Sequence, residues 1–446
     1  MDSADTVYRD TPCGRVKGQL LSDAEIYRGI PYAETARFTL PVQITSWDGV
    51  LDATQTEKDC WQYSAFRDES KDAEHFYYTE FRSERSFDYV ENPMTLNIIC
   101  PRHAQNCPVV IFIHGGGHET GTVGELPYGN STEYAKRGAI LISVGYRLNV
   151  FSLYRSRNYG LHDQIAAVHW IHDNISAFGG NPERMILIGQ SAGAMSITDL
   201  CYTQKLKGLI KGAVLMSGGG VVPRVAGPWT EKQSAAFWDG VCRRAGAADE
   251  EELKKVSPQV LWEAWHAEYQ GNNLHLRQPG IDGDIIPDVP QKIIRRGEDL
   301  DIPMIFGVTA QDFMPTVLYE MALSFGKRNT RKKKSPVYGY MFRRTPPGNC
   351  YKAFHAVDLW YMFGNMQSSW RKFEPQDYAL SAQMIDRVVA FAQTGNPNCE
   401  GLPDWPAISA KQKSFLCFDA DSPGLLSPRQ CRRLVWHTLL RDPGPM

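Results

Sequence analysis

Short apolar runs, each followed by polar, glycine-rich or helical sequence, set the pattern of the chain from residue 108 onward. The five runs are Val109–Ile113, Ala139–Val144, Met185–Ile188, Gly212–Met216 and Pro303–Val308. Their length and their glycine, proline or polar borders predict strands buried on both faces. Between them, Gly160–Asn174 carries an apolar stripe that predicts an amphipathic helix: Ile165, Val168 and Ile171, continued by Ile175. Alternating strands and helices predict an α/β fold with a parallel sheet covered on both faces.

The remaining sequence adds material around this sheet. Residues 7–60 predict short strands and turns, and Pro336–Phe342 alternates like a late strand. Three segments are expected to be excursions or cap segments around a pocket: 61–92, rich in aromatic and charged residues, the tryptophan-containing helical stretch 224–275, and 313–335. Within the last, the basic run Lys327–Lys334 is predicted to be a solvated loop. We expect residues 1–446 to form one domain.

A glycine-flanked serine follows the third apolar run. Met185–Ile188 leads directly into Gly189-Gln190-Ser191-Ala192-Gly193, and a helix-compatible stretch comes next. This is G-x-S-x-G between a strand and a helix, where two residues without side chains let strand and helix approach closely. The pattern predicts a nucleophilic Ser191 at the positive end of a helix.

Three consecutive glycines at the end of the first run supply a second part of the same chemistry. His114-Gly115-Gly116-Gly117-His118 follows Val109–Ile113, so backbone N–H groups can point into one small space. The N–H of Ala192, one residue past the serine, is the usual further donor. Together the two motifs predict an oxyanion hole beside Ser191.

Serine requires a base, and the base should follow it in a loop late in the chain. His355 meets both conditions, and the rivals are His266, His275 and His437. The base in turn requires a carboxylate that orients the imidazole. Asp312, just past the strand Pro303–Val308, fits the order serine, acid, histidine. The alternatives are Asp282, in what resembles a plain turn, and Asp358.

Composition and charge limit the expected partners and cellular location of the protein. The chain is 43% hydrophobic and 22% charged with a formal net charge of -2, which gives no reason to expect nucleic acid or an acidic membrane surface as partner. No apolar run is long enough to span a bilayer, and the polar amino terminus lacks the features of a signal peptide. The 10 cysteines contain no C-x-x-C pair, so we expect free thiols and a cytoplasmic location, without zinc.

With these residues in place, the chain resembles the type-B carboxylesterases, the family that includes the cholinesterases, and specifically their bacterial members. The matching motifs are Arg28–Ala33 (RGIPYA), His114–Gly117 (HGGG), Gly145–Asn149 (GYRLN), Gly160–Gln164 (GLHDQ), Phe178–Pro182 (FGGNP), Gly189–Ala194 (GQSAGA), Thr394–Pro397 (TGNP) and Trp405-Pro406. They occur in the family order over most of the chain. The resemblance implies an α/β-hydrolase fold with a shortened cap region.

The resemblance also implies roles for single residues. It makes Ser191 the nucleophile, His355 the base and Asp312 the acid, and it makes Ser217 a serine that lies behind the histidine. The oxyanion donors it implies are Gly116, Gly117 and Ala192. The implied activity is cleavage of small-molecule carboxylic esters through an acyl-enzyme, with no metal and no organic cofactor. The oligomeric state stays open.

Several departures from the family pattern bear on specificity. The acid is Asp312 where the family mostly has glutamate, and Gln190 replaces the glutamate before the serine, which makes choline esters unfavourable substrates. Cys60 matches the first cysteine of the usual early disulfide, but Pro93 stands at the second position. His118 replaces an aromatic residue and is expected to face the pocket rim.

The separation between acid and base is also short. His355 follows Asp312 by 43 residues (355 − 312), so we expect the helices usually inserted there to be cut back and the pocket to favour short acyl chains. An amidase or acyltransferase would use the same machinery. A non-catalytic adhesion module is the alternative from another class, and the intact serine and base speak against it.

Overall fold

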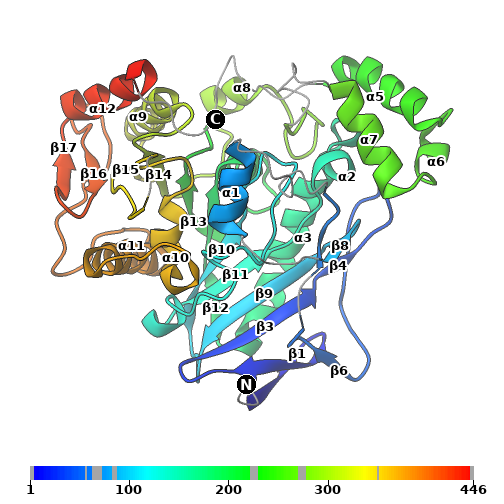
Figure 1. The fold of residues 1–446 in the computed structure, drawn as a ribbon, viewed down its shortest axis with the longest axis horizontal. Coiled ribbons are helices and arrows are strands. Elements are labelled where there is room, and N and C mark those ends of the chain that lie inside the picture. Colours follow the sequence, from blue (N-terminus) through cyan, green and yellow to red (C-terminus); the bar gives the residue numbers. More distant parts are fainter. Residues whose placement is uncertain are drawn as a thin grey trace.

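One large twisted sheet runs through the molecule (Figure 1). The computed structural model describes residues 5–55, 58–62, 73–82, 88–220, 230–269, 278–348 and 351–441. Within these residues the sheet has 13 strands, in the order β1-β2-β3-β9-β11-β10-β12-β13-β14-β15-β16-β17, with β6 beside β2. The strands from β11 to β16 are parallel, and the pairs on either side of this block are antiparallel.

The parallel block contains all five predicted strands as direct neighbours. They are β11 (Ile140–Val144), β10 (Cys107–Ile113), β12 (Gly180–Gln190), β13 (Ile210–Met216) and β14 (Met304–Thr309). The next strand, β15 (Val337–Phe342), confirms the prediction for Pro336–Phe342. β16 (Phe415–Phe418) and β17 (Gly424–Leu426) complete that edge. The predicted parallel α/β sheet is therefore confirmed.

Short strands form the other edge, as residues 7–60 predict, and they pair antiparallel except for β6, which runs parallel to β2. They are β1 (Asp5–Thr11), β2 (Gly14–Leu20), β3 (Ala24–Pro31), β6 (Val50–Asp52) and β9 (Thr95–Pro101). Two small separate sheets pair β4 (Ala33–Glu34) with β5 (Val42–Gln43) and β7 (Lys58–Cys60) with β8 (Asp88–Val90). The second pair brings together the two ends of segment 61–92, because β7 precedes this segment and β8 lies near its end.

Both faces of the sheet are buried, which explains the unbroken apolar runs. In β10, Val109 and Ile111 face one hydrophobic cluster, whereas Val110 and Phe112 face another. The first cluster contains the stripe of α3 (Tyr159–Asn174), so the predicted helix is confirmed. The second contains α10 (Asp358–Phe363) and α11 (Pro375–Thr394). Because α10 begins three residues after His355, this second layer anchors the predicted base.

The loop predicted for the basic run Lys327–Lys334 is wrong, because most of this run is helical. It forms the end of α9 (Pro315–Lys332), an 18-residue helix whose apolar face includes Leu318, Ala322 and Phe325. That face packs on β14 and β15, so α9 is the crossover between two parallel strands. Its cations lie in the final turns, where they complement the negative end of the helix dipole.

The other helices surround the sheet. They are α1 (Ala73–Phe81), α2 (Asn149–Ser152), α4 (Ala192–Leu200), α5 (Glu231–Ala245), α6 (Glu250–Leu253), α7 (Pro258–Tyr269), α8 (Pro290–Arg296) and α12 (Pro428–Arg441). Figure 1 shows α5, α6 and α7 grouped on one side of the molecule, away from α12. Trp238 and Trp265 are fully buried in this group, as expected for a helical segment within 224–275. No helix in the described ranges has the length and apolarity that crossing a bilayer requires.

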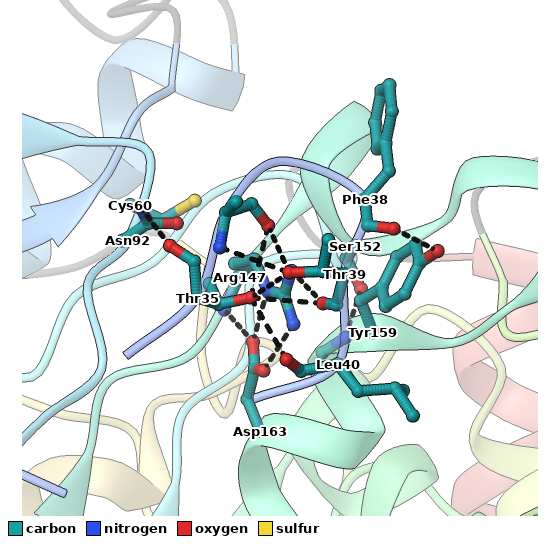
Figure 2. Close-up of polar contacts among 12 residues, drawn as sticks. Thr35, Phe38, Thr39, Leu40, Cys60, Asn92, Arg147, Ser152, Tyr159 and Asp163 are labelled. Atoms are coloured by element: carbon teal, nitrogen blue, oxygen red, sulfur yellow. Dashed lines mark hydrogen bonds and ion pairs between the residues drawn. The ribbon is translucent and has the colours of Figure 1, made fainter. Parts of the chain in front are cut away.

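A buried ion pair ties the amino-terminal chain to the helical layer (Figure 2). Arg147, which follows β11, donates to both carboxylate oxygens of Asp163 on α3, at 2.6 and 2.8 Å. The same guanidinium donates to the carbonyl of Thr39, and Tyr159 donates to the carbonyl of Phe38. The segment connecting β4 to β5 is thereby fixed against α3.

Candidate active site

Ser191 occupies a sharp turn between β12 and α4, as the G-x-S-x-G motif predicts. Its backbone has φ 54° and ψ −121°, a region that residues other than glycine rarely adopt. The turn is held by a hydrogen bond from the Ser191 N–H to the Met216 carbonyl at 2.8 Å. A Cβ on Gly193 would collide with the backbone oxygen of Ile113, so only glycine permits this approach of α4 to β10.

Three backbone donors are free around this turn. Within the described part of the chain, the N–H groups of Gly116, Gly117 and Ala192 donate to no protein acceptor. Gly116 and Gly117 have φ values of 104° and 66°, so the loop turns sharply at the end of β10. Ala192 is the first residue of α4, where an N–H has no partner inside the helix. Unpaired donors beside a nucleophile are what an oxyanion hole requires.

His355 and Asp312, the predicted base and acid, are in contact. His355 Nδ1 lies 2.8 Å from Asp312 Oδ1, and both side chains are nearly inaccessible to solvent. The two loops are joined again by a backbone bridge between Gln311 and Phe354 and by the bond from the Ala353 N–H to Gln311. The short separation of 43 residues therefore suffices to bring acid and base together.

Asp312 is kept ionised by its neighbours. Burial would raise the pKa of its carboxyl, but the charge and hydrogen bond of His355, with contributions from Ser217 and Thr309, hold that pKa below its ordinary value. The Thr309 hydroxyl donates to Oδ2 at 2.9 Å, and the Phe313 N–H donates to Oδ1 at 2.8 Å. Ser217 lies close enough to Asp312 to help lower that pKa, although no hydrogen bond of normal length joins the two side chains.

The alternative acids lie elsewhere. Asp358 is fully buried beneath the pair and accepts a hydrogen bond from the Tyr340 hydroxyl at 2.7 Å instead of one from His355. Burial, opposed by that hydrogen bond and assisted by the Asp312 charge, raises the pKa of Asp358 to about 7. Asp282 accepts bonds from Asn158 and from backbone N–H groups in its own turn, as the plain-turn interpretation predicts.

Of the alternative bases, the structure describes the side chain of His266. His266 lies on α7, where its ring stacks on Trp262 with 4.6 Å between centroids. His275 and the side chain of His437 are outside the described residues. His355 is thus the candidate whose ring contacts both a carboxylate and the turn that carries Ser191.

Gln190 contacts the second ring nitrogen of His355. Its side-chain nitrogen lies 3.1 Å from His355 Nε2, and the residue is 4% exposed. Among the described residues, no hydrogen bond joins the Ser191 hydroxyl to His355. The sequence identified Gln190 as a departure from the family but not as a contact of the histidine.

His118 does not lie at an exposed rim, so that expectation is wrong. Its side chain is 4% exposed, and its Nε2 lies 3.1 Å from the Ser196 hydroxyl on α4. The cause is the backbone: φ is 63° at His118, and this left-handed turn directs the ring toward α4.

Aromatic rings beside the base were missed by sequence analysis. Phe313, 44% exposed, stacks on His355 with centroids 4.3 Å apart. Tyr77 of α1 meets Phe313 edge-on, and Phe76 packs against Tyr351 and Phe354. These rings come from three separate segments, so no local pattern could have grouped them. They provide an apolar wall next to the reacting groups.

Comparison with known proteins agrees with this geometry. The model of the carboxylesterase family matches residues 5–331 and 322–432. A para-nitrobenzyl esterase of Bacillus subtilis is 30% identical over 92% of this chain and 94% of its own length. A cocaine esterase of Oryctolagus cuniculus is 29% identical over 98% of this chain and 97% of its own.

Solved structures of esterases share the fold. A thermophilic para-nitrobenzyl esterase superimposes with a TM-score of 0.81 and 26% identity, over 96% of this chain and 99% of the other. A carboxylesterase of Geobacillus stearothermophilus gives a TM-score of 0.78 at 25% identity with the same coverage. The chain therefore belongs to the carboxylesterase family, has the α/β-hydrolase fold and is a carboxylic ester hydrolase.

Proposed function

We propose that this hydrolase cleaves esters through an acyl-enzyme on Ser191, with His355 as general base and Asp312 as the orienting acid. The observation that carries the proposal is the buried 2.8 Å contact between His355 Nδ1 and Asp312 Oδ1, directly beside the serine turn. It favours the imidazole tautomer with the proton on Nδ1, so that Nε2 carries the lone pair that can take a proton.

In the proposed cycle, His355 Nε2 takes the proton of the Ser191 hydroxyl as its oxygen bonds to the ester carbonyl carbon. The carbonyl oxygen becomes negative and is stabilised by the N–H groups of Gly116, Gly117 and Ala192. His355 then gives the proton to the leaving alcohol as the carbon–oxygen bond breaks. Water repeats the sequence on the acyl-enzyme, releasing the acid and restoring Ser191.

The substrate class follows from the lining of the site. Phe313 and the rings behind it offer apolar contact next to His355, which suits an ester with a compact apolar group on one side. The same residues could also transfer the acyl group of an amide. Comparing kcat/KM for an ester and an anilide with the same acyl group distinguishes an esterase, for which the ester is strongly preferred, from an amidase.

We also infer that the 446 residues act as one domain in a reducing compartment such as the cytoplasm. The continuous sheet from β1 to β17 supports the single domain. The nine described cysteines are all unpaired, and eight of them are buried, which supports the reducing setting.

The triad is tested by Ser191→Ala. The change removes the nucleophile with little change in volume, and loss of a triad nucleophile costs on the order of a million-fold in kcat. We expect p-nitrophenyl acetate turnover to fall to background while the circular dichroism spectrum and Tm stay near those of the wild type. Turnover close to wild type in a folded variant would exclude Ser191 as nucleophile.

A further inference from the structure

A cavity of about 880 Å³ lies between α8 and α9, and its lining includes no residue of the candidate active site. Figure 1 shows both helices near the upper edge of the molecule, and Lys332 on α9 donates to the Arg295 carbonyl of α8 at 2.6 Å. Ala410, in the segment before β16, completes the lining. The volume falls within the range of about 300–1,000 Å³ that is usual for small-molecule pockets.

The lining of this cavity is strongly positive. Glu320 is the one carboxylate among the described lining residues, and it contacts Arg432 of α12 at 3.5 Å. The cations of the lining are Arg295, Lys327, Arg328, Arg331 and Lys332. Clustered charge of one sign along a hollow raises the local concentration of the opposite ion. The cavity therefore favours an anion.

Most of these cations lack an ion-pair partner. Among the described residues, none of the lining cations other than Arg328 forms an ion pair. Lys292 and Arg296 differ, although they lie on the same helix as Arg295. Both contact the carboxylate of Asp288, at 3.2 and 2.9 Å, and neither lines the cavity. The positive charge that lines the cavity is thus left uncompensated by the fold.

Arg328 combines burial with an unused donor. Its Nη2 donates to Asp299 at 2.7 Å, and its guanidinium lies over the ring of Phe325 at 4.7 Å from the centroid. The side chain is only 9% exposed, yet its Nη1 is buried with no acceptor in the described part of the chain. Buried donors are normally satisfied. An anion held in the cavity would supply an acceptor on this side of the guanidinium.

The cavity also has an apolar part. Ile294 of α8 is half-buried, and Met321 and Phe325 of α9 are buried. Small inorganic anions would leave this apolar surface without a matching partner. A ligand that carries both an anionic head and an apolar body fits the whole lining, because each part then meets side chains of its own kind.

We propose that the cavity between α8 and α9 is a second binding site, which takes an amphipathic carboxylate such as a medium-chain fatty acid. The carboxylate would be held by Arg295 and Arg331, and the chain would cover Ile294, Met321 and Phe325. The proposal goes beyond the proposed function and is independent of it, because no residue of the triad takes part.

The first test is isothermal titration of the full-length protein with decanoate at neutral pH and low salt. Decanol and inorganic phosphate are titrated in parallel, because the first lacks the charge and the second lacks the chain. Decanoate should bind saturably and more tightly than either, and added salt should weaken it because ion pairs are screened. Absence of saturable binding, or equal affinity for decanol or phosphate, would overturn the proposal.

A pair of double variants locates the site. The variant Arg295→Gln/Arg331→Gln removes two lining cations, and we expect the Kd for decanoate to rise by about tenfold or more, as for the loss of a charge-assisted hydrogen bond. The matched control Lys292→Gln/Arg296→Gln removes the same charge from residues outside the lining, so its Kd should stay near that of the wild type. Equal weakening in both would indicate a general charge effect and overturn the proposal. An unchanged Kd in the first variant, as expected for binding at the active site, would overturn it as well.

Ile294→Ser tests the apolar part and serves if the double variant does not fold. The change shortens a half-buried apolar side chain of the lining, so decanoate should bind about five-fold more weakly or worse, since each CH₂ that leaves water contributes about 0.8 kcal/mol. Circular dichroism and Tm confirm that each variant is folded. Decanoate affinity equal to that of the wild type in folded Ile294→Ser would overturn the proposal.

Discussion

At the scale of single residues, the site separates three aspartates that the sequence could only rank. Asp312 contacts His355, Asp358 is bonded to Tyr340 below the pair, and Asp282 closes a distant turn. Only the first has an oxygen directed at the imidazole. The order of motifs ranks it first, because the parallel strand before Asp312 ends at the same edge as the serine turn.

Asp312→Asn should be far more damaging than Asp282→Asn. An amide at the orienting position favours the wrong imidazole tautomer, which costs roughly 10⁴ in kcat in a comparable triad. Asp282→Asn should affect stability of its turn while leaving kcat within a few-fold of the wild type. The measurement is kcat for p-nitrophenyl acetate in both variants, and the reverse ranking would show that the carboxylate was chosen wrongly.

His118 should matter for stability and not for selectivity. His118→Phe removes the bond to Ser196 and leaves that buried hydroxyl with the longer 3.4 Å bond from Gln164, at a cost of about 1–3 kcal/mol in the free energy of unfolding. Urea denaturation measures that loss, and a panel of esters measures selectivity. If the variant changed the order of ester preference but not the unfolding midpoint, His118 would be shown to line the substrate pocket.

At the scale of elements, α9 shows where pattern analysis of charge is insufficient. The run Lys327–Lys334 is polar enough to indicate a loop, but Leu318, Ala322 and Phe325 upstream already establish one apolar helix face. The helix continues into the basic run because Arg328 is buried in a 2.7 Å contact with Asp299, while Arg331 and Lys332 in the last turn complement the helix dipole. The polar run is thus the partly buried end of a packed element.

The path of α9 bears directly on acyl selectivity. Because α9 packs against β14 and β15, we expect it to leave the space above Ser191 largely open, and the segment between acid and base otherwise supplies Phe313 and Tyr351 near the site. Each buried CH₂ contributes about 0.8 kcal/mol only where it leaves water. We therefore expect kcat/KM to favour short acyl chains, with loose demands on the alcohol.

Two ester series check this expectation. In p-nitrophenyl esters from acetate to laurate, kcat/KM should peak at the short chains, and acetates of increasingly large alcohols should retain most of their kcat/KM. A steady rise toward laurate would mean that a closed apolar tunnel exists, built by segments 61–92 or 224–275.

At the scale of the whole molecule, the cysteines should behave as thiols. Cys60 accepts a hydrogen bond from the Leu148 N–H through its sulfur at 3.2 Å, and Pro93 occupies the position of its usual partner. Thiol titration of the protein unfolded without reductant should detect every cysteine. A disulfide-linked Cys60 peptide in mass spectrometry would contradict this and indicate an oxidising compartment.

The extent of the sequence prediction has a physical pattern. The sheet, α3 and the serine turn follow from local periodicity and from motifs whose geometry is fixed over a few residues, such as Gly189–Gly193. The contacts of Gln190 with His355 and of Phe313 with Tyr77 join segments far apart in the chain. A periodic pattern reports local structure and therefore does not predict them. His118 was misplaced because its contact with Ser196 likewise joins residues that are far apart in the chain.

The central claim is that an acyl group is transferred to Ser191. The most direct measurement is acid quenching during turnover of p-nitrophenyl acetate, followed by peptide mapping, with Ser191→Ala as the control. The account predicts a burst of one p-nitrophenol per enzyme and an acetyl group on the peptide that contains Ser191, both absent from the control. An acetyl group on another residue, or the same burst in Ser191→Ala, would contradict it.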